Sequence, residues 1–282
     1  MKPFALSNGV LIPVNGFGVY QISKEDTVSS VLSALKIGYR HIDTAEAYFN
    51  EEEVGEAIRR SGLQRDELFI TTKIWVDRYG EEKSYEAGLQ SLRKLGLEYV
   101  DLFLLHQPIG DYYGAYRALE RLYEEGKAKA IGVSNFNADR LVDLCIFSKI
   151  KPMVNQIEIN PFHQRGTDKE WADKYGVLLE AWAPFAEGRN NIFGNETLLS
   201  IGKKHNRSVA QVILRWLYQR GIVSLAKSVH ENRMKENFDI DSFSLDENDM
   251  EEIKTLERGE SSFFDHRDPK MVEFLSNLAK GK

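Results

Sequence analysis

The chain has 282 residues, of which 37 are basic and 43 acidic, so its formal charge is −6. Hydrophobic residues at 42% and charged residues at 28% are typical of a globular protein and exclude a fibrous or intrinsically disordered chain. The acidic balance argues against nucleic acid as a partner, and no stretch approaches the roughly 20 apolar residues of a membrane span.

The first predicted element is a β-hairpin. Residues 4–6 and 10–12 flank Asn8-Gly9, a dipeptide that favours a tight type I′ turn because both residues accept positive φ. Eight short runs follow whose interiors are apolar throughout, as in parallel strands that are covered on both faces. These predicted strands are residues 16–19, 39–43, 68–74, 100–106, 130–134, 154–159, 177–182 and 222–227.

Amphipathic segments fill the intervals between these runs and predict helices. Residues 27–37, 85–95 and 116–125 are each followed by a glycine, the residue that most readily adopts the left-handed conformation at the end of a helix. Ser208 and Gln211 have the spacing of a capping box before a further helix.

The alternation of strands and helices predicts an α/β fold with right-handed parallel crossovers. A closed barrel and an open doubly wound sheet both satisfy this pattern. No Pro-, Gly- or Ser-rich linker interrupts it, so we expect a single domain over residues 1–282. The last interval leaves room for an additional loop and helix around residues 189–199. The tail after Arg258 is expected to be an appendage whose only large apolar pair is Phe263 and Phe264.

One glycine pattern suggests a dinucleotide-binding fingerprint. Gly16-Phe17-Gly18 matches the start of G-x-G-x-x-G, but Gln21 stands where the third glycine would be. Two glycines are weak evidence, and we reject this interpretation.

Polar residues recur near the ends of successive predicted strands, about one βα unit apart. They are Asp43, Lys73, His106, Ser134, Asn135, Asn155, Gln156, Lys227 and Ser228. In a closed barrel these strand ends converge on one face, where the active sites of that architecture lie. In an open sheet they would be spread along a line.

Taken singly, these residues have ordinary structural explanations. His106 alone is more often a core histidine, Asp43 equally suits a helix N-cap, and a lone Tyr48 more often only packs. Lys73 is harder to explain, because a lysine inside an apolar strand needs a partner to stay charged. Pairing it with Asp43 explains both residues. The remaining histidines lack ligand spacing, so we expect no metal.

The motifs around these residues resemble those of the aldo-keto reductase family. GYRHIDTAEAYFNEEEVG (residues 38–55) resembles the first family signature and KAIGVSNF (129–136) the second. LAKS (225–228), followed by Arg233, Glu236 and Asn237, resembles the third. TTKIW (71–75) and LHQP (105–108) correspond to the lysine strand and the histidine strand end. With AWAP (181–184), the chain is most similar to the bacterial branch that includes 2,5-diketo-D-gluconate reductases.

The resemblance implies a (β/α)8 TIM barrel with an N-terminal β-hairpin, and NADPH-dependent reduction of aldehydes or ketones to alcohols. It also implies a catalytic tetrad of Asp43, Tyr48, Lys73 and His106, with Tyr48 as general acid. Physically, a nearby Lys73 ammonium favours the phenolate and should make Tyr48 a readier proton donor. Asp43 would hold the ammonium, and a neutral His106 would orient the carbonyl group.

The same resemblance implies a set of NADPH contacts. Ser134, Asn135 and Gln156 would meet the carboxamide, and Trp182 would stack on the nicotinamide. Charged donors suit phosphate recognition, and the adenosine 2′-phosphate would be met by Lys227, Ser228 and Arg233. The remaining implied cofactor residues are Glu236 and Asn237, near the adenine, with Gly18, Val19 and Tyr20.

One alternative function remains open: an NADPH-binding redox sensor or regulatory subunit with little turnover. The start of the chain, MKPFALSNGV, lacks the apolar run of a signal peptide, and the single Cys145 cannot form an internal disulfide. We therefore expect a cytoplasmic protein. We also expect a monomer whose partner is a small-molecule carbonyl substrate, in a pocket lined by residues 107–113, 189–193 and the tail near Phe263.

Overall fold

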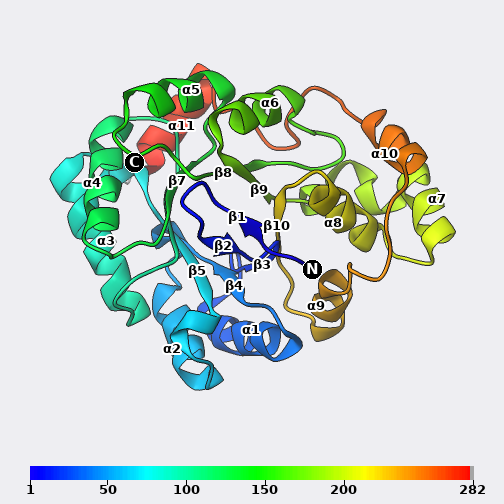
Figure 1. Cartoon of the computed structure of the whole chain (residues 1–282), viewed down its shortest axis with the longest axis horizontal. Helices are drawn as coiled ribbons and strands as arrows, with labels where there is room; N and C mark the ends of the chain where they lie inside the picture. Colours follow the sequence, from blue (N-terminus) through cyan, green and yellow to red (C-terminus); the bar gives the residue numbers. More distant parts are fainter. Residues whose placement is uncertain (280–282) are drawn as a thin grey trace.

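Eight parallel strands close into a barrel in the computed structural model, which describes residues 1–279 (Figure 1). Each of the predicted strands is present, and the closed barrel excludes the open sheet. The strands pair in the order β10-β3-β4-β5-β6-β7-β8-β9. They are β3 (Asn15–Gly18), β4 (His41–Asp43), β5 (Phe69–Ile74), β6 (Leu102–Leu105), β7 (Ile131–Ser134), β8 (Val154–Glu158), β9 (Leu178–Trp182) and β10 (Val223–Ala226). The predicted (β/α)8 fold is confirmed.

Helices surround the barrel and connect its strands (Figure 1). They are α1 (Lys24–Ile37), α2 (Glu51–Ser61), α3 (Glu81–Leu95), α4 (Tyr112–Glu124), α5 (Ala138–Phe147), α6 (Gly166–Tyr175), α7 (Glu196–His205), α8 (Val209–Gln219), α9 (Glu231–Phe238), α10 (Glu247–Lys254) and α11 (Pro269–Ala279). Short 3₁₀ turns are η1 (Glu46–Tyr48), η2 (Arg65–Glu67), η3 (Val76–Arg78) and η4 (Ala186–Gly194). None of these helices is long and apolar enough to cross a membrane.

The helix boundaries follow the predicted signals. Gly38 and Gly96 come directly after α1 and α3 with φ of 128° and 66°. Ser208 and Gln211 form both halves of the predicted capping box at the start of α8. The additional segment expected before the last strand consists of η4 and α7.

The N-terminal hairpin of β1 (Phe4–Ala5) and β2 (Leu11–Ile12) is confirmed, but the predicted type I′ turn is wrong. Only Gly9 of the Asn8-Gly9 pair takes positive φ, at 85°. The Leu6 amide donates to the Val10 carbonyl (2.8 Å), so the loop contains three residues, a known alternative in which glycine ends the turn. The Asn8 side chain contacts the barrel instead, because its Nδ2 donates to the Lys129 carbonyl at 2.9 Å.

The barrel interior is tightly packed. Leu6 and Ile12 of the hairpin region are 4% and 0% exposed and join the core from one end. Gly132 shows how close the strands approach: a Cβ there would lie 2.3 Å from the Val154 carbonyl oxygen. Any larger residue would therefore separate β7 from β8.

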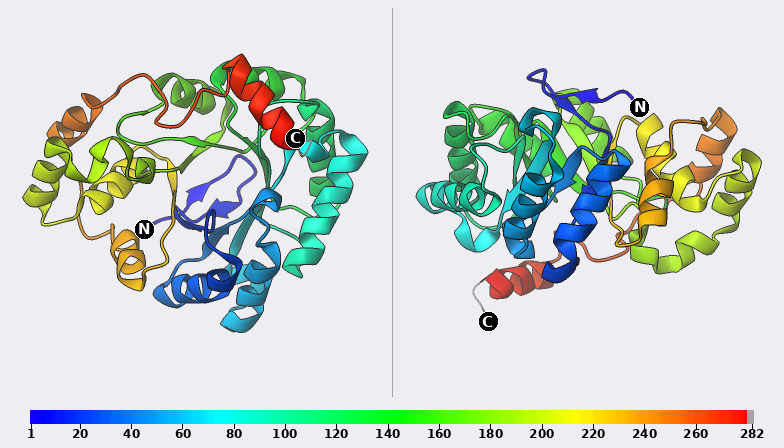
Figure 2. Two further views of the ribbon diagram at one scale, coloured as in Figure 1. Left: turned by 180° about the vertical axis from the view of Figure 1, so that it is seen from behind. Right: turned by 90° about the horizontal axis from the view of Figure 1, so that it is seen from below.

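The C-terminal tail is more structured than expected. It forms α11, in which Leu275 is only 5% exposed, so the tail has apolar residues besides Phe263 and Phe264. Figure 2 shows α11 and the hairpin at opposite ends of the barrel. Its apolar residues Met271, Phe274, Leu275 and Leu278 have the spacing of one helical face, so the signal for this helix was present in the sequence.

Candidate active site

A buried ion pair joins the carboxyl ends of β4 and β5. Lys73 is 0% and Asp43 3% exposed, and Lys73 Nζ donates to Asp43 Oδ1 at 2.6 Å. The ammonium also donates to the Thr44 carbonyl (2.9 Å) and to the Tyr48 hydroxyl (3.3 Å). These three partners use all three donors of the lysine. Burial lowers the pKa of Lys73, but the Asp43 carboxylate raises it by more than burial lowers it. The pKa of Lys73 therefore lies above its ordinary value.

Tyr48 lies at the end of η1, which two side-chain contacts attach to the segment after β5. Glu46 accepts from the Trp75 amide (3.3 Å) and from Arg78 Nε (3.2 Å). The Tyr48 ring packs against Tyr20, with centroids 4.9 Å apart. Burial raises the pKa of Tyr48 to about 12, although Lys73 acts in the opposite direction. The expected effect of Lys73 is therefore present, but burial outweighs it, and the hydroxyl keeps its proton at neutral pH.

His106 follows β6 and completes the group. Its ring meets Tyr48 and Trp75 edge-on, with centroid distances of 5.6 and 5.0 Å. Burial, assisted by the Lys73 charge, lowers the pKa of His106 well below its usual value, so the imidazole is neutral. Its Nδ1 is buried and has no hydrogen-bond partner among residues 1–279. Because Nδ1 is closed to solvent, a bound group can reach a ring nitrogen of His106 only at Nε2.

The residues expected near the nicotinamide lie at the ends of β7, β8 and β9. Ser134 Oγ donates to the Gln156 backbone carbonyl at 2.7 Å. Asn135, with φ of 66°, donates to the His106 carbonyl (3.0 Å) and accepts from Trp182 Nε1 (2.8 Å). Asn135 therefore links His106 to the partly exposed Trp182 ring.

Inside the barrel, Gln156 contacts carboxyl groups. Its Nε2 donates to Asp43 Oδ2 (2.9 Å) and to Glu180 Oε2 (2.7 Å). Glu180, on β9, is 0% exposed and was missed from the sequence. The signal was available, since a charged residue inside the apolar run 177–182 is as unusual as Lys73 in its own strand.

The other expected cofactor residues form an arc around the rim. Gly18 ends β3, with Val19 and the half-exposed Tyr20 directly after it. Lys227 and Ser228 follow the adjacent β10, and α9 contains Arg233, Glu236 and the buried Asn237. Strand order places this arc between Trp182 on β9 and Asp43 on β4. Lys227 and Arg233 are exposed and make no ion pair within residues 1–279. Within residues 1–279, no hydrogen bond or ion pair joins these two cations to the tetrad.

Two cavities lie beside the site. One of about 280 Å³ is lined by Asn135, Trp182 and tail residues that include Phe264 and His266. The tail is fastened there because Glu158 accepts from Ser261 Oγ (2.5 Å) and the Ser262 amide (3.0 Å). Phe263 also packs on Trp182 at 5.2 Å, as expected of a tail that borders the pocket.

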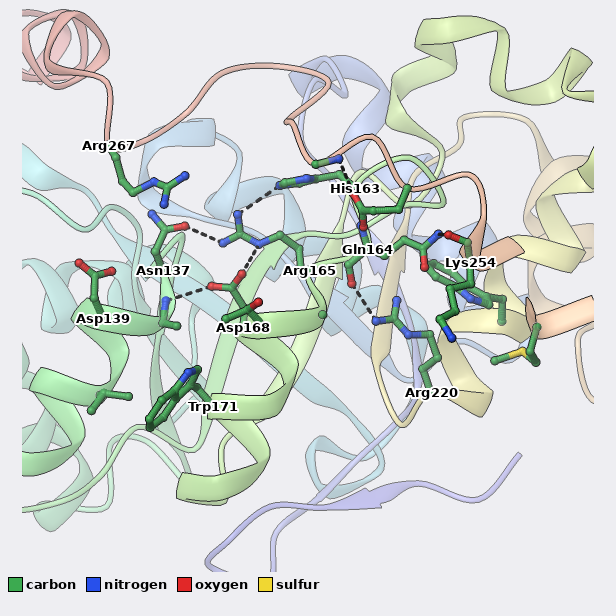
Figure 3. A pocket seen from close by; sticks show the side chains of 18 of the residues that line it. Asn137, Asp139, His163, Gln164, Arg165, Asp168, Trp171, Arg220, Lys254 and Arg267 are labelled. Carbon is green, nitrogen blue, oxygen red and sulfur yellow. Dashed lines mark hydrogen bonds and ion pairs between the residues drawn. The ribbon is translucent and has the colours of Figure 1, made fainter. Parts of the chain in front are cut away.

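The larger cavity, about 1070 Å³, lies on the flank of the barrel around Arg165 (Figure 3). Arg165 there binds Asn137 Oδ1 at 2.8 Å and pairs with Asp168 at 3.1 Å. None of the tetrad residues lines it.

Comparisons with known proteins agree with this geometry. The profile of the Aldo/keto reductase family matches residues 14–258. The chain is 48% identical to glyoxal reductase from Bacillus subtilis, over 90% of this chain and 92% of that protein. Among solved structures it is similar to an aldo-keto reductase from a deep-sea metagenome library (TM-score 0.92, 43% identity, 94% and 98% covered). It is also similar to a Bombyx mori aldo-keto reductase in complex with NADP (TM-score 0.88, 32% identity, 93% and 94% covered). The chain therefore belongs to the aldo/keto reductase family.

Proposed function

We propose that this chain reduces an aldehyde or ketone to the alcohol with NADPH, and that Tyr48 donates the proton. The observation that supports this proposal most directly is the 3.3 Å contact between the Tyr48 hydroxyl and a buried ammonium that Asp43 holds at 2.6 Å. When bound, NADPH supplies the hydride. The residues of the chain must then stabilise the negative charge that develops on the carbonyl oxygen.

Each tetrad residue has a distinct part in that stabilisation. The Tyr48 hydroxyl is protonated at neutral pH because burial raises its pKa to about 12. Lys73 stabilises the phenolate that remains once the proton is given to the substrate oxygen. Asp43 keeps the ammonium charged despite its burial. His106, which is neutral and lies edge-on beside the Tyr48 ring, is placed to hydrogen-bond the same carbonyl group.

The residues present fit NADPH. Lys227 and Arg233 offer two exposed cations without ion-pair partners in residues 1–279, a pair suited to the 2′-phosphate. Ser228, the third implied contact, is buried, and its hydroxyl is bonded to the His230 backbone. The partly exposed Trp182 ring offers a face for the nicotinamide, fixed by its bond to Asn135. A solved relative holds NADP. Ser134 and Gln156 would lie near the carboxamide, Glu236 and Asn237 near the adenine, and Gly18, Val19 and Tyr20 beside the rim.

The proposed substrates are small aldehydes and ketones, beginning with 2-oxoaldehydes. The Bacillus subtilis relative is named a glyoxal reductase, which makes glyoxal the first compound to test. Tyr20 packs against Tyr48, and Trp75 packs against His106, so the site has aromatic walls. Such walls favour a substrate whose principal polar group is the reacting carbonyl. Sugar-like carbonyl compounds belong in the same panel.

The test follows the absorbance of the reduced nicotinamide with NADPH and this panel. Wild-type protein should consume NADPH, and Tyr48→Phe should lose at least about a hundredfold in kcat, the size of a general-acid effect. Tyr175→Phe, on α6 outside the site, is the matched control and should keep wild-type kcat. If Tyr48→Phe keeps wild-type turnover, the assignment of the acid is wrong. Tight NADPH binding without turnover on any carbonyl would instead favour the redox sensor.

The assembly and location are part of the same proposal. We propose that the chain acts as a monomeric single domain over residues 1–282 in the cytoplasm. Light scattering after size-exclusion chromatography should give one mass near 32.3 kDa. A stable mass twice as large would contradict the monomer.

A further inference from the structure

A second buried carboxyl group adjoins the Asp43–Lys73 pair inside the barrel. Glu180 and Asp43 both accept from the amide nitrogen of Gln156, at 2.7 and 2.9 Å. Both hydrogens of that amide are therefore used, and its nitrogen is fixed between two carboxyl groups. The orientation of Gln156 consequently depends on both acids.

The ammonium of Lys73 balances the charge of Asp43 and leaves a second carboxylate at Glu180 without a counter-ion. Lys73 donates to Asp43, Thr44 and Tyr48 and makes no hydrogen bond to Glu180. Two carboxylates that share one amide beside a single ammonium repel each other. Since Lys73 binds Asp43 directly, Glu180 is the acid that keeps the proton at neutral pH. Burial and the Asp43 charge raise the pKa of Glu180 to about 8.

The remaining neighbours of Glu180 are uncharged. His41 Nε2 lies 3.6 Å from Glu180 Oε1 and 3.0 Å from Thr71 Oγ1. Burial lowers the pKa of His41 to about 3, so its ring is neutral. The adjacent strand β10 (Val223–Ala226) has no titratable side chain. Glu180 Oε1 has no hydrogen-bond partner among residues 1–279.

Glu180 is also close to the proposed nicotinamide platform along its own strand. Trp182 lies two residues further on β9, and side chains at positions i and i+2 point to the same face of a strand. A charge on Glu180 would therefore act on a group bound against Trp182 through the buried interior of the barrel, where electrostatic interactions are stronger than in bulk water. The nicotinamide ring is positively charged when oxidised and neutral when reduced.

We propose that Glu180 is a positioning residue with a second role as a proton-dependent discriminator between the two forms of the cofactor. It is protonated and neutral beside the reduced form, and it releases its proton to solvent when the oxidised form binds. This inference rests on the proposed function. Neutral Glu180 favours NADPH, and ionised Glu180 favours NADP⁺, so rising pH shifts the binding preference toward the oxidised cofactor.

The experiment measures the dissociation constants of NADPH and NADP⁺ by quenching of tryptophan fluorescence from about pH 6.5 to 9.5, the range that brackets the raised pKa. In wild-type protein the affinity for NADP⁺ relative to NADPH should rise roughly five- to tenfold over this range. Glu180→Gln, which keeps the shape and removes the titration, should abolish the rise. Glu120→Gln, a buried carboxyl on α4 that accepts from the Ile150 amide away from the site, is the matched control and should keep the rise.

A second measurement needs no variant. Calorimetry of wild-type protein at about pH 8, in two buffers of different ionisation enthalpy, should show a larger proton release when NADP⁺ binds than when NADPH binds. A pH-independent preference, or a rise that Glu180→Gln retains, would overturn the inference even if turnover is normal. Binding without carbonyl reduction would instead refute the proposed function and leave the result for Glu180 intact.

Discussion

Replacing Asp43 by asparagine tests how much the buried ammonium of Lys73 depends on its counter-ion. The substitution keeps the size of the side chain but removes the charge that lies 2.6 Å from a fully buried lysine. Leaving one member of a buried pair without its partner costs about 3–5 kcal/mol of unfolding free energy. We therefore expect Asp43→Asn to lose roughly that amount at pH 7, together with most of its activity.

The direction of the pH dependence follows from the causes of the Lys73 pKa. In wild type the folded pKa is raised by Asp43, so this stability is present below the ordinary lysine pKa and is lost only above it. Without Asp43, burial remains and lowers the folded pKa. The unfolded chain then binds more protons between the two pKa values, so the deficit of Asp43→Asn should shrink as pH rises from 7 toward about 10.

Urea unfolding at several pH values measures this deficit, with the double variant Asp43→Asn/Lys73→Met as the control. Removing both charges should recover part of the lost stability, because an apolar side chain in place of the ammonium needs no counter-ion. Wild-type stability of Asp43→Asn at pH 7, or losses that simply add in the double variant, would refute the view that Asp43 compensates the charge of Lys73.

Two further predictions concern the cofactor and the barrel wall. Arg233→Ala should weaken NADPH binding about tenfold or more while leaving NADH binding nearly unchanged, because only NADPH has the 2′-phosphate. Lys235→Ala, on the same helix but paired with Glu231 at 2.6 Å, should change neither affinity. Equal losses for both nucleotides would remove the assignment of Arg233 to the 2′-phosphate. Gly132→Ala should cost about 2 kcal/mol or more of unfolding free energy, because the new Cβ would meet a backbone oxygen 2.3 Å away. Thermal unfolding measures this loss, and Gly166→Ala, whose added Cβ would meet nothing within 4 Å, should be nearly neutral in it.

Much of the site could be predicted from the sequence because its signals are local. Short apolar runs with polar ends predicted the barrel strands, and Lys73 was paired with Asp43 because a lysine inside an apolar strand needs a partner to stay charged. The structure brings these residues together with Tyr48 and His106. The family motifs added the expectation of which rim residues meet the cofactor.

Other features depended on contacts between distant segments. The turn at Asn8 changed type, with its side chain bonded to the backbone at Lys129, more than a hundred residues away. The sequence shows that Glu180 is a charged residue inside an apolar run, but its partners depend on strand register: pairing of β8 with β9 sets it beside Gln156. Closure of the barrel then brings both opposite Asp43. The sequence indicates which segments can form strands and which buried charges need an opposite charge nearby. Only the closed barrel decides which charges share one buried interior, since electrostatic coupling there depends on distance in space rather than along the chain.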